Sequence, residues 1–206
     1  MKPEVSPLDV YDAAYFDGLF AASPDPWGFE SRWYERRKRA LTLACLPSLR
    51  YRYGYEPGCA NGELSAALAG RCDRLLVSDG ADKAVALART RLQAHQHVEV
   101  IKAWVPEAWP DQTFDLIVLS EFLFYVSVPD LEGIAARVLD SLAPGGTVLA
   151  CHWRHPVAHS VMNGDQAHAH LTRCLKLPTL CHVLEPDLRL DVWSTAPSVA
   201  RQEGFV

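Results

Sequence analysis

The sequence predicts an α/β fold, with a mostly parallel sheet of seven strands, helices on both faces and an antiparallel hairpin at the end. First, short apolar runs alternate with helical patterns after residue 49, as in parallel sheets with right-handed crossovers. Second, the run 116–119 is continuously apolar, which is typical of a strand covered on both faces. Third, two short alternating segments around Pro186-Asp187 break this rhythm and predict the hairpin.

The part of the chain before the sheet is predicted to be helical. We expect residues 1–48 to form an N-terminal helical lid and residues 49–206 to form the sheet, within a single structural domain overall. Helices are predicted over 8–20 and 31–46, and Pro47 ends the second one because it cannot continue a helix.

The remaining elements follow from apolar spacing and turn residues. The predicted helices 82–94 and 129–142 each have one apolar stripe, and Pro129 stands at a first-turn position that a helix tolerates. The predicted strands are 52–56, 75–78, 98–101, 115–120, 146–152, 180–185 and 188–193, and the predicted helices between them are 62–71, 82–94 and 129–142.

Composition excludes several classes of function. The net charge of −5 argues against binding to nucleic acid or to an anionic membrane, and no apolar stretch approaches the roughly 20 residues that cross a bilayer. The six cysteines form no CxxC pair, which favours reduced thiols in the cytoplasm. We expect no metal site, and four histidines are expected to be solvated loop residues instead of ligands: His159, His168, His170 and His182. The basic run 36–39 is expected to be a solvated helix face.

Two features predict a nucleoside-containing cofactor. The turn from Glu56 to Gly62 joins a strand to a helix, and its glycines let a ligand touch the backbone. Asp79 ends the next predicted strand, where a carboxylate accepts hydrogen bonds from a ribose diol.

This turn resembles the first motif of class I methyltransferases that use S-adenosylmethionine. In that motif an acid precedes glycines at alternate positions, and Ala60 replaces the middle glycine here. The segments 113–121 and 142–148 resemble two further motifs of the same class, in the expected order. The resemblance implies a Rossmann-like class I methyltransferase fold, with S-adenosyl-L-methionine as cofactor and S-adenosyl-L-homocysteine as product.

The family usually has an acid after its third strand that receives the adenine amino group, and the segment 101–106 has none. Adenine is therefore expected to depend on backbone groups and apolar packing near Trp104. The resemblance implies these cofactor-binding residues: Trp27, Arg37, Glu56, Gly58, Cys59, Ala60, Gly62, Asp79, Gly80, Trp104, Val105 and Ser120.

A closer resemblance covers almost the whole chain. The segments 15–17, 23–27, 33–38, 56–59, 105–110 and 152–156 are similar to those of the nodulation protein S group. The namesake of that group N-methylates the non-reducing glucosamine of a deacetylated chitooligosaccharide. The resemblance implies a small-molecule acceptor with an amine, such as an amino sugar or saccharide conjugate, and a lid that folds over the cofactor. The chain is expected to be a monomer or a homodimer.

The acceptor is expected at the end of the fifth strand. His152 is the first candidate for the base, since an imidazole suits proton uptake near neutral pH, and His155 is the second. Glu121 is expected to orient the amine or bind the cofactor. Three further residues are expected to contact the acceptor: Tyr125 as a pocket wall, Trp153 by stacking and Arg154 by holding an acidic group.

Three alternatives stay open. An O-methyltransferase of a secondary metabolite would need a stronger base than an amine does. A nicotinamide-dependent oxidoreductase is disfavoured, because G-x-G-x-x-G is absent and the terminal hairpin does not belong to that fold. A non-catalytic protein that binds the cofactor would explain Ala60 and the missing adenine acid.

Overall fold

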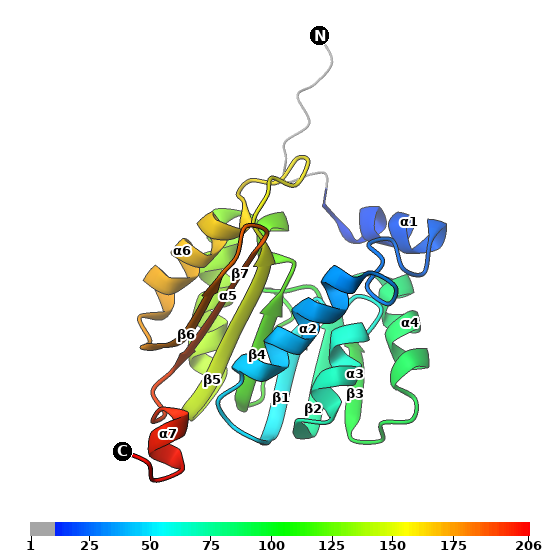
Figure 1. Ribbon diagram of the computed structural model, residues 1–206. Coiled ribbons are helices and arrows are strands. Elements are labelled where there is room, and N and C mark those ends of the chain that lie inside the picture. Colours follow the sequence, from blue (N-terminus) through cyan, green and yellow to red (C-terminus); the bar gives the residue numbers. More distant parts are fainter. Residues whose placement is uncertain (1–10) are drawn as a thin grey trace.

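A computed structural model describes residues 11–206 as one mixed sheet between two layers of helices (Figure 1). The strand order is β3-β2-β1-β4-β5-β7-β6. Neighbouring strands from β3 to β5 are parallel, whereas β7 is antiparallel to both β5 and β6. The predicted fold class is therefore confirmed, including the hairpin at the end.

The bounds of the elements are close to the predicted ones. The strands are β1 Tyr51–Pro57, β2 Cys72–Asp79, β3 Val98–Lys102, β4 Phe114–Ser120, β5 Leu142–Trp153, β6 Thr179–Leu184 and β7 Leu188–Ser194. The helices are α1 Ala13–Ala22, α2 Trp33–Cys45, α3 Glu63–Ala69, α4 Asp82–Leu92, the 3-10 helix η2 Leu123–Tyr125, α5 Val128–Ser141, α6 Gly164–Leu175 and α7 Val199–Gln202.

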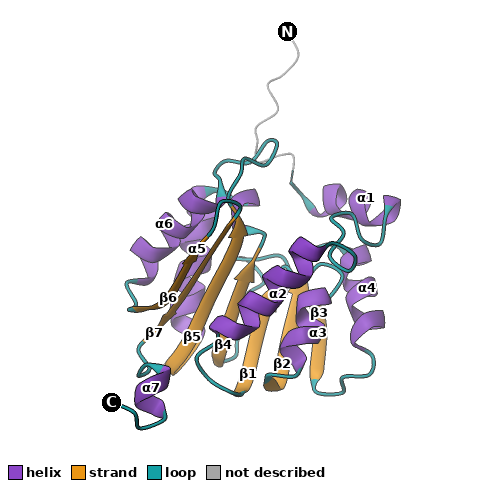
Figure 2. Ribbon diagram, in the orientation of Figure 1, coloured by secondary structure: helices purple, strands orange, loops and turns teal. Residues whose placement is uncertain are grey.

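Helices cover both faces of the sheet, as the uninterrupted apolar β4 requires (Figure 2). Helices α2, α3 and α4 lie on one face, and α5 and α6 lie on the other. Each face has its own apolar core, and the two cores include Leu68 and Leu92 on the first face and Ile134 and Leu171 on the second.

The strand order brings the predicted cofactor residues to one edge. The chain runs outward from β1 through β2 to β3 and then returns to β4 on the other side of β1. This reversal leaves a crevice beyond the carboxyl ends of β1 and β4, which is where open α/β sheets bind ligands. Glu56, Asp79 and Ser120 lie at the carboxyl ends of β1, β2 and β4, which all meet this edge.

Helix α6 is absent from the predicted elements, and the expectation for His168 was wrong. Asn163 caps this helix in a reciprocal bond with Gln166, and Ala167 and Leu171 face the core. His168 lies on the same buried face, with 0% of its surface exposed, so it is not a solvated loop residue. Its polar character concealed the apolar stripe from the sequence analysis.

The N-terminal helix also differs from its prediction. Helix α1 begins at Ala13, after Asp12 accepts a hydrogen bond from the backbone N–H of Tyr15 (2.7 Å), and residues 8–10 of the predicted helix lie outside the described residues. Across residues 11–206, none of the helices combines the length and apolar character that a bilayer crossing requires.

Candidate active site

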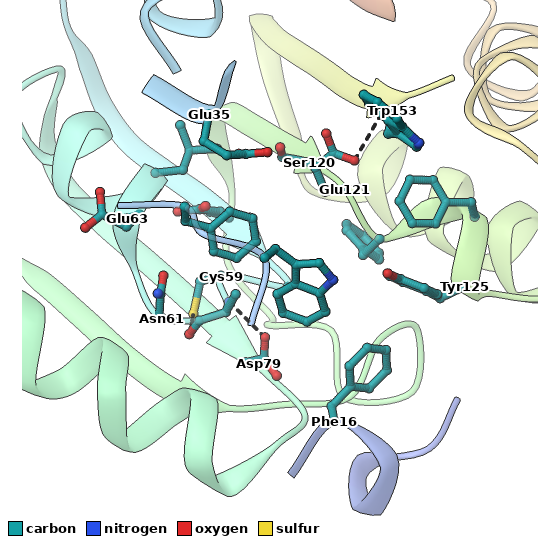
Figure 3. Close-up of a pocket in the computed structure, with 18 of the residues that line it drawn as sticks. Phe16, Glu35, Cys59, Asn61, Glu63, Asp79, Ser120, Glu121, Tyr125 and Trp153 are labelled. Carbon is teal, nitrogen blue, oxygen red and sulfur yellow. Dashed lines mark hydrogen bonds between the residues drawn. The ribbon is translucent and has the colours of Figure 1, made fainter. Parts of the chain in front are cut away.

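A cavity of about 740 Å³ lies at the carboxyl edge of the sheet, under α1 and α2 (Figure 3). Asp79 and Phe16 lie on one side of it, and Glu121 and Trp153 lie on the other. The predicted site residues that line it are Trp27, Glu56, Gly58, Cys59, Ala60, Asp79, Gly80, Trp104, Val105, Ser120, Glu121, Tyr125 and Trp153.

Asp79 is fixed by backbone donors at the tip of β2. Its Oδ2 accepts a hydrogen bond from the N–H of Ala60, and its Oδ1 accepts one from the N–H of Ala81, both at 2.9 Å. Burial raises the pKa of Asp79, and these N–H donors oppose the shift. A carboxylate has about four lone-pair directions, so each oxygen keeps one for a donor in the cavity.

Glu56 has a buried oxygen without a partner. Its side chain is 2% exposed, and Oε2 has no hydrogen-bond partner among the described residues. Burial raises the pKa of Glu56 to about 8, with a smaller contribution from Asp79. The Oδ1 atom of Asn61 is in the same condition. Since buried acceptors are nearly always satisfied, these two atoms mark a place for a ligand with N–H donors or a positive charge.

The turn between β1 and α3 has the left-handed backbone that its glycines predict. Gly58 has φ +70°, and a Cβ there would lie 3.1 Å from the ring of Phe122. Ala60 adopts φ +51° even though it has a side chain. This conformation costs roughly 1–2 kcal/mol for a residue other than glycine, and the bond from its N–H to Asp79 helps to hold it.

Gly80 and Trp104 form a packed pair beside Asp79. A Cβ on Gly80 would lie 1.9 Å from Cε3 of Trp104, so only glycine allows the indole to lie against the backbone. Trp104 is 40% exposed and lines the cavity together with Val105. The apolar surroundings expected for adenine, in a segment without an acid, are therefore present.

The N-terminal segment covers this side of the cavity. Trp27 packs between Phe20 and Phe29, with ring centroids 5.5 and 5.4 Å apart. Asn61 Nδ2 donates a hydrogen bond to the carbonyl of Pro24 (3.2 Å), which connects the glycine turn to the loop before α2. Trp27 therefore lines the cavity and also packs α1 against the loop that precedes α2.

Glu121 lies at the opposite end, where β4 stops. It has φ +60°, and its Oε2 accepts a hydrogen bond from the N–H of Trp153 (3.0 Å) at the end of β5. Trp153 meets Tyr34 of α2 edge to face at 5.4 Å. Tyr125 of η2 closes the wall between the two ends of the cavity.

His152 does not reach the cavity, which argues against its predicted role as the base. Its side chain is 0% exposed because it points from β5 toward α6. Its Nε2 accepts a hydrogen bond from the N–H of Leu123 (3.2 Å), and its Nδ1 lies 3.0 Å from Nε2 of His168. Burial lowers the pKa of His152 well below its usual value. An acceptor in the cavity cannot transfer a proton directly to this ring.

Other predicted residues also lie outside the lining, each for a visible reason. Arg37 forms an ion pair with Glu185, and Arg154 forms one with Asp165. The side chain of His155 is half exposed, and its Nε2 lies 2.6 Å from Oδ1 of Asp187. Asp187 itself lines the cavity.

Gly62 does not line the cavity. It caps the beginning of α3 with φ +80°, and a Cβ there would lie 3.2 Å from the Cα of Ala88 in α4. Within residues 11–206, no three His, Cys, Asp or Glu side chains form a group that could hold a metal ion.

The sequence analysis missed the charged cluster of α2. Residues 36–39 were expected to be a solvated face, but Lys38 is 6% exposed and lines the cavity between Glu35 and Glu121. The spacing of Glu35 and Lys38 on one helix was a usable signal, because residues three apart share a face. The remaining lining residues outside the predicted set include Tyr11, Phe16, Phe20, Phe29, Arg32, Tyr34, Arg39, Asn61, Glu63 and Asp187.

The strand order, the terminal hairpin and the cavity at the carboxyl edge together define the class I fold of S-adenosylmethionine-dependent methyltransferases. A family model described as nodulation protein S matches residues 19–174. The chain belongs to the nodulation protein S family. It is 32% identical over 145 residues to nodulation protein S of Rhizobium tropici, an alignment that covers 69% of this chain and 61% of that relative.

Two solved structures share this fold. A candidate methyltransferase of Pseudomonas syringae is 50% identical, with a TM-score of 0.72, and the match covers 79% of this chain and 99% of that one. The N-methyltransferase NodS of Bradyrhizobium japonicum WM9, in complex with S-adenosyl-L-homocysteine, has a TM-score of 0.78 at 24% identity, covering 88% and 97% of the two chains.

Proposed function

We propose that this protein transfers a methyl group from S-adenosyl-L-methionine to an amine of a small-molecule acceptor, an amino sugar or saccharide conjugate. The family and the class I fold support this reaction. The observation that carries the proposal is one cavity with Asp79 and Glu56 at one end and Glu121 beside Trp153 at the other. The first end suits a nucleoside with a charged tail, and the second suits an amine next to an aromatic surface.

The residues present fit the cofactor. Asp79 has lone pairs free for two ribose hydroxyls, and the orphaned Oε2 of Glu56 suits the ammonium group of a methionyl tail. Trp104 and Val105 offer the apolar surface that adenine needs. The bound cofactor would supply a methyl group already activated on a sulfonium. The chain then has to align the acceptor and exclude water, and alignment alone contributes about 7–11 kcal/mol in favourable cases.

Glu121 is the proposed proton acceptor. A sugar amine is partly protonated near neutral pH and must lose one proton before it attacks, a task within reach of a carboxylate. A hydroxyl would need a stronger base, and no histidine lines the cavity within the described residues. This favours N-methylation over the O-methyltransferase alternative. Arg154, the residue expected to hold an acidic group of the acceptor, is engaged by Asp165 outside the lining.

Three further assignments go with this function. All six cysteines are free thiols, which supports a location in the cytoplasm. The described part of the N-terminal segment, residues 11–48, acts as the lid, since Trp27 and Lys38 both line the cavity. The enzyme acts as a monomer or homodimer on a small molecule and binds neither nucleic acid nor membrane.

Two measurements test the proposal. Calorimetry with S-adenosyl-L-homocysteine should give saturable binding, and NAD should give none. Mass spectrometry should then detect a single added methyl group on a deacetylated chitooligosaccharide or another amino sugar, and none on the N-acetylated form. Binding without methylation across a panel of amino sugars would favour a non-catalytic protein, and no binding would refute the cofactor assignment.

A further inference from the structure

A buried charged cluster connects α2 to the end of β4. The Nζ atom of Lys38 lies 2.7 Å from Oε1 of Glu121 and 2.9 Å from Oε2 of Glu35. The three side chains are 7%, 17% and 10% exposed in that order, and all three line the cavity. Because buried charges are costly unless they are paired, this arrangement requires an explanation.

The cluster has one ammonium for two carboxylates. Burial acts to lower the pKa of Lys38, but Glu121 and Glu35 outweigh it and the net shift is upward, so the ammonium is retained. Arg39 of α2 also lines the cavity, but it is bound to Glu63 and to the carbonyl of Phe29. One negative charge of the cluster therefore remains open to the cavity.

Contacts other than the one with Lys38 also restrict the conformation of Glu121. Its N–H donates to the carbonyl of Cys151 (3.0 Å), and its Oε2 accepts from the N–H of Trp153 (3.0 Å). Its positive φ is costly for a residue with a side chain, and such strain persists where the surroundings fix it, often at functional sites. Lys38 holds the other oxygen, so the carboxylate is fixed from the sheet and from α2 at once.

We propose that Lys38 is a positioning residue, which orients the Glu121 carboxylate toward an acceptor that arrives as an ammonium ion, and that Glu35 completes this cationic subsite. The inference rests on the proposed function and adds the charge state of the acceptor. The aromatic rings of Tyr34 and Phe29, 5.5 and 5.9 Å from Nζ, shield the cluster from solvent.

The acceptor ammonium gives one proton to the Glu121 carboxylate and becomes a neutral amine. The lone pair of the amine forms the new N–C bond to the methyl carbon, while the C–S bond breaks and its electron pair stays on sulfur. The product is an N-methylammonium ion, and Glu121 returns its proton to solvent. Lys38 keeps its own proton throughout.

The decisive variant is the double substitution Lys38→Met/Glu35→Gln. This variant removes one positive and one negative charge, so the net charge of the cluster is unchanged. A loss of activity therefore reports the position of the Glu121 carboxylate and not a weaker attraction for a cationic acceptor. We expect kcat/KM for a deacetylated chitooligosaccharide to fall about 100-fold, as misplacement of a reacting group by about 1 Å does. The Kd for S-adenosyl-L-homocysteine should stay within about threefold of wild type, since the other end of the cavity is unchanged.

Lys38→Arg retains the charge and a donor to Glu121, so it should restore kcat/KM to within about tenfold of wild type. Arg36→Met is the matched control, because Arg36 lies on the same helix, is exposed and is not among the residues that line the cavity, so the change should leave kcat/KM nearly unchanged. If Lys38 had only a structural role, kcat/KM and the affinity for S-adenosyl-L-homocysteine would fall together, in proportion to the loss of stability.

If the double variant does not fold, Lys38→Gln/Glu35→Gln keeps the hydrogen bonds without the charges and should still lower kcat/KM about tenfold. A folded variant of either kind with wild-type kcat/KM overturns the proposal, as does a parallel loss of affinity for S-adenosyl-L-homocysteine. Failure of the wild-type protein to methylate any amine refutes the proposed function itself, so the two failures are distinguishable.

Discussion

His152 is expected to matter for stability rather than for chemistry, and His152→Ala tests this. Because the backbone N–H of Leu123 can only donate, Nε2 of His152 is the acceptor and Nδ1 has the proton. His168 then accepts at Nε2 and donates from Nδ1 to Asp191 (2.6 Å). The chain of bonds runs in one direction with both rings neutral, from η2 through β5 and α6 to β7.

The expected loss follows from these contacts. His152→Ala leaves the Leu123 N–H and the His168 Nε2 buried without partners, and each such group costs about 1–3 kcal/mol. The void beside Phe124, whose ring lies 5.5 Å from the imidazole, adds to this. We expect the free energy of unfolding to fall by roughly 3–5 kcal/mol.

Urea denaturation at pH 7.5 measures this loss, and His155→Ala is the control. His155 makes one exposed ion pair with Asp187, so its removal should cost about 0–1 kcal/mol. The activity of folded His152→Ala should stay near wild type at saturating acceptor. A variant that is as stable as wild type but inactive would refute the argument, because it would assign a chemical role to the buried ring.

Three further predictions concern pH and the cofactor end. Burial lowers the pKa of His152 and His168; below about pH 6.5 the unfolded chain binds protons that the native state excludes. Denaturation at pH 7.5 and 5.5 should therefore show stability lost with falling pH, by up to about 1.4 kcal/mol per unit for each histidine. Asp79→Ala should weaken calorimetric binding of S-adenosyl-L-homocysteine roughly 100-fold, since two charge-assisted bonds are lost, and unchanged affinity would contradict the ribose assignment. Ala60→Gly should keep the affinity for S-adenosyl-L-homocysteine. The free energy of unfolding should be equal or up to about 1 kcal/mol higher, because the positive φ then costs nothing. A clearly lower free energy of unfolding in urea would show that the methyl group of Ala60 is needed.

The fold and the cofactor end were predictable because their signals are local. Continuous apolar runs mark covered strands, and the turn from Glu56 to Gly62 needs particular backbone angles that its glycines reveal. Asp79 follows from its position at a strand end. These features need no knowledge of what packs against them.

The other end of the cavity depends on contacts between distant parts of the chain. A histidine at the end of β5 is equally compatible with a cavity or a core, and the choice for His152 is made by α6, whose apolar stripe is broken by polar residues. Lys38 lies in a basic run that resembles a solvated face until Glu121, far along the sequence, is placed beside it. Burial of this kind is a property of the assembled fold.

The charges of the cavity connect its two ends. Its lining has more acids than bases, with Glu35, Asp79, Glu121 and Asp187 among the acids and Lys38 among the bases. In the proposed reaction two cations, a sulfonium and an ammonium, must meet in a space of low dielectric, where their repulsion is strong. Carboxylates at both ends offset that repulsion before transfer. Transfer removes one of the two positive charges, so the products are held less strongly than the reactants and the same electrostatics that assemble the complex also favour its release.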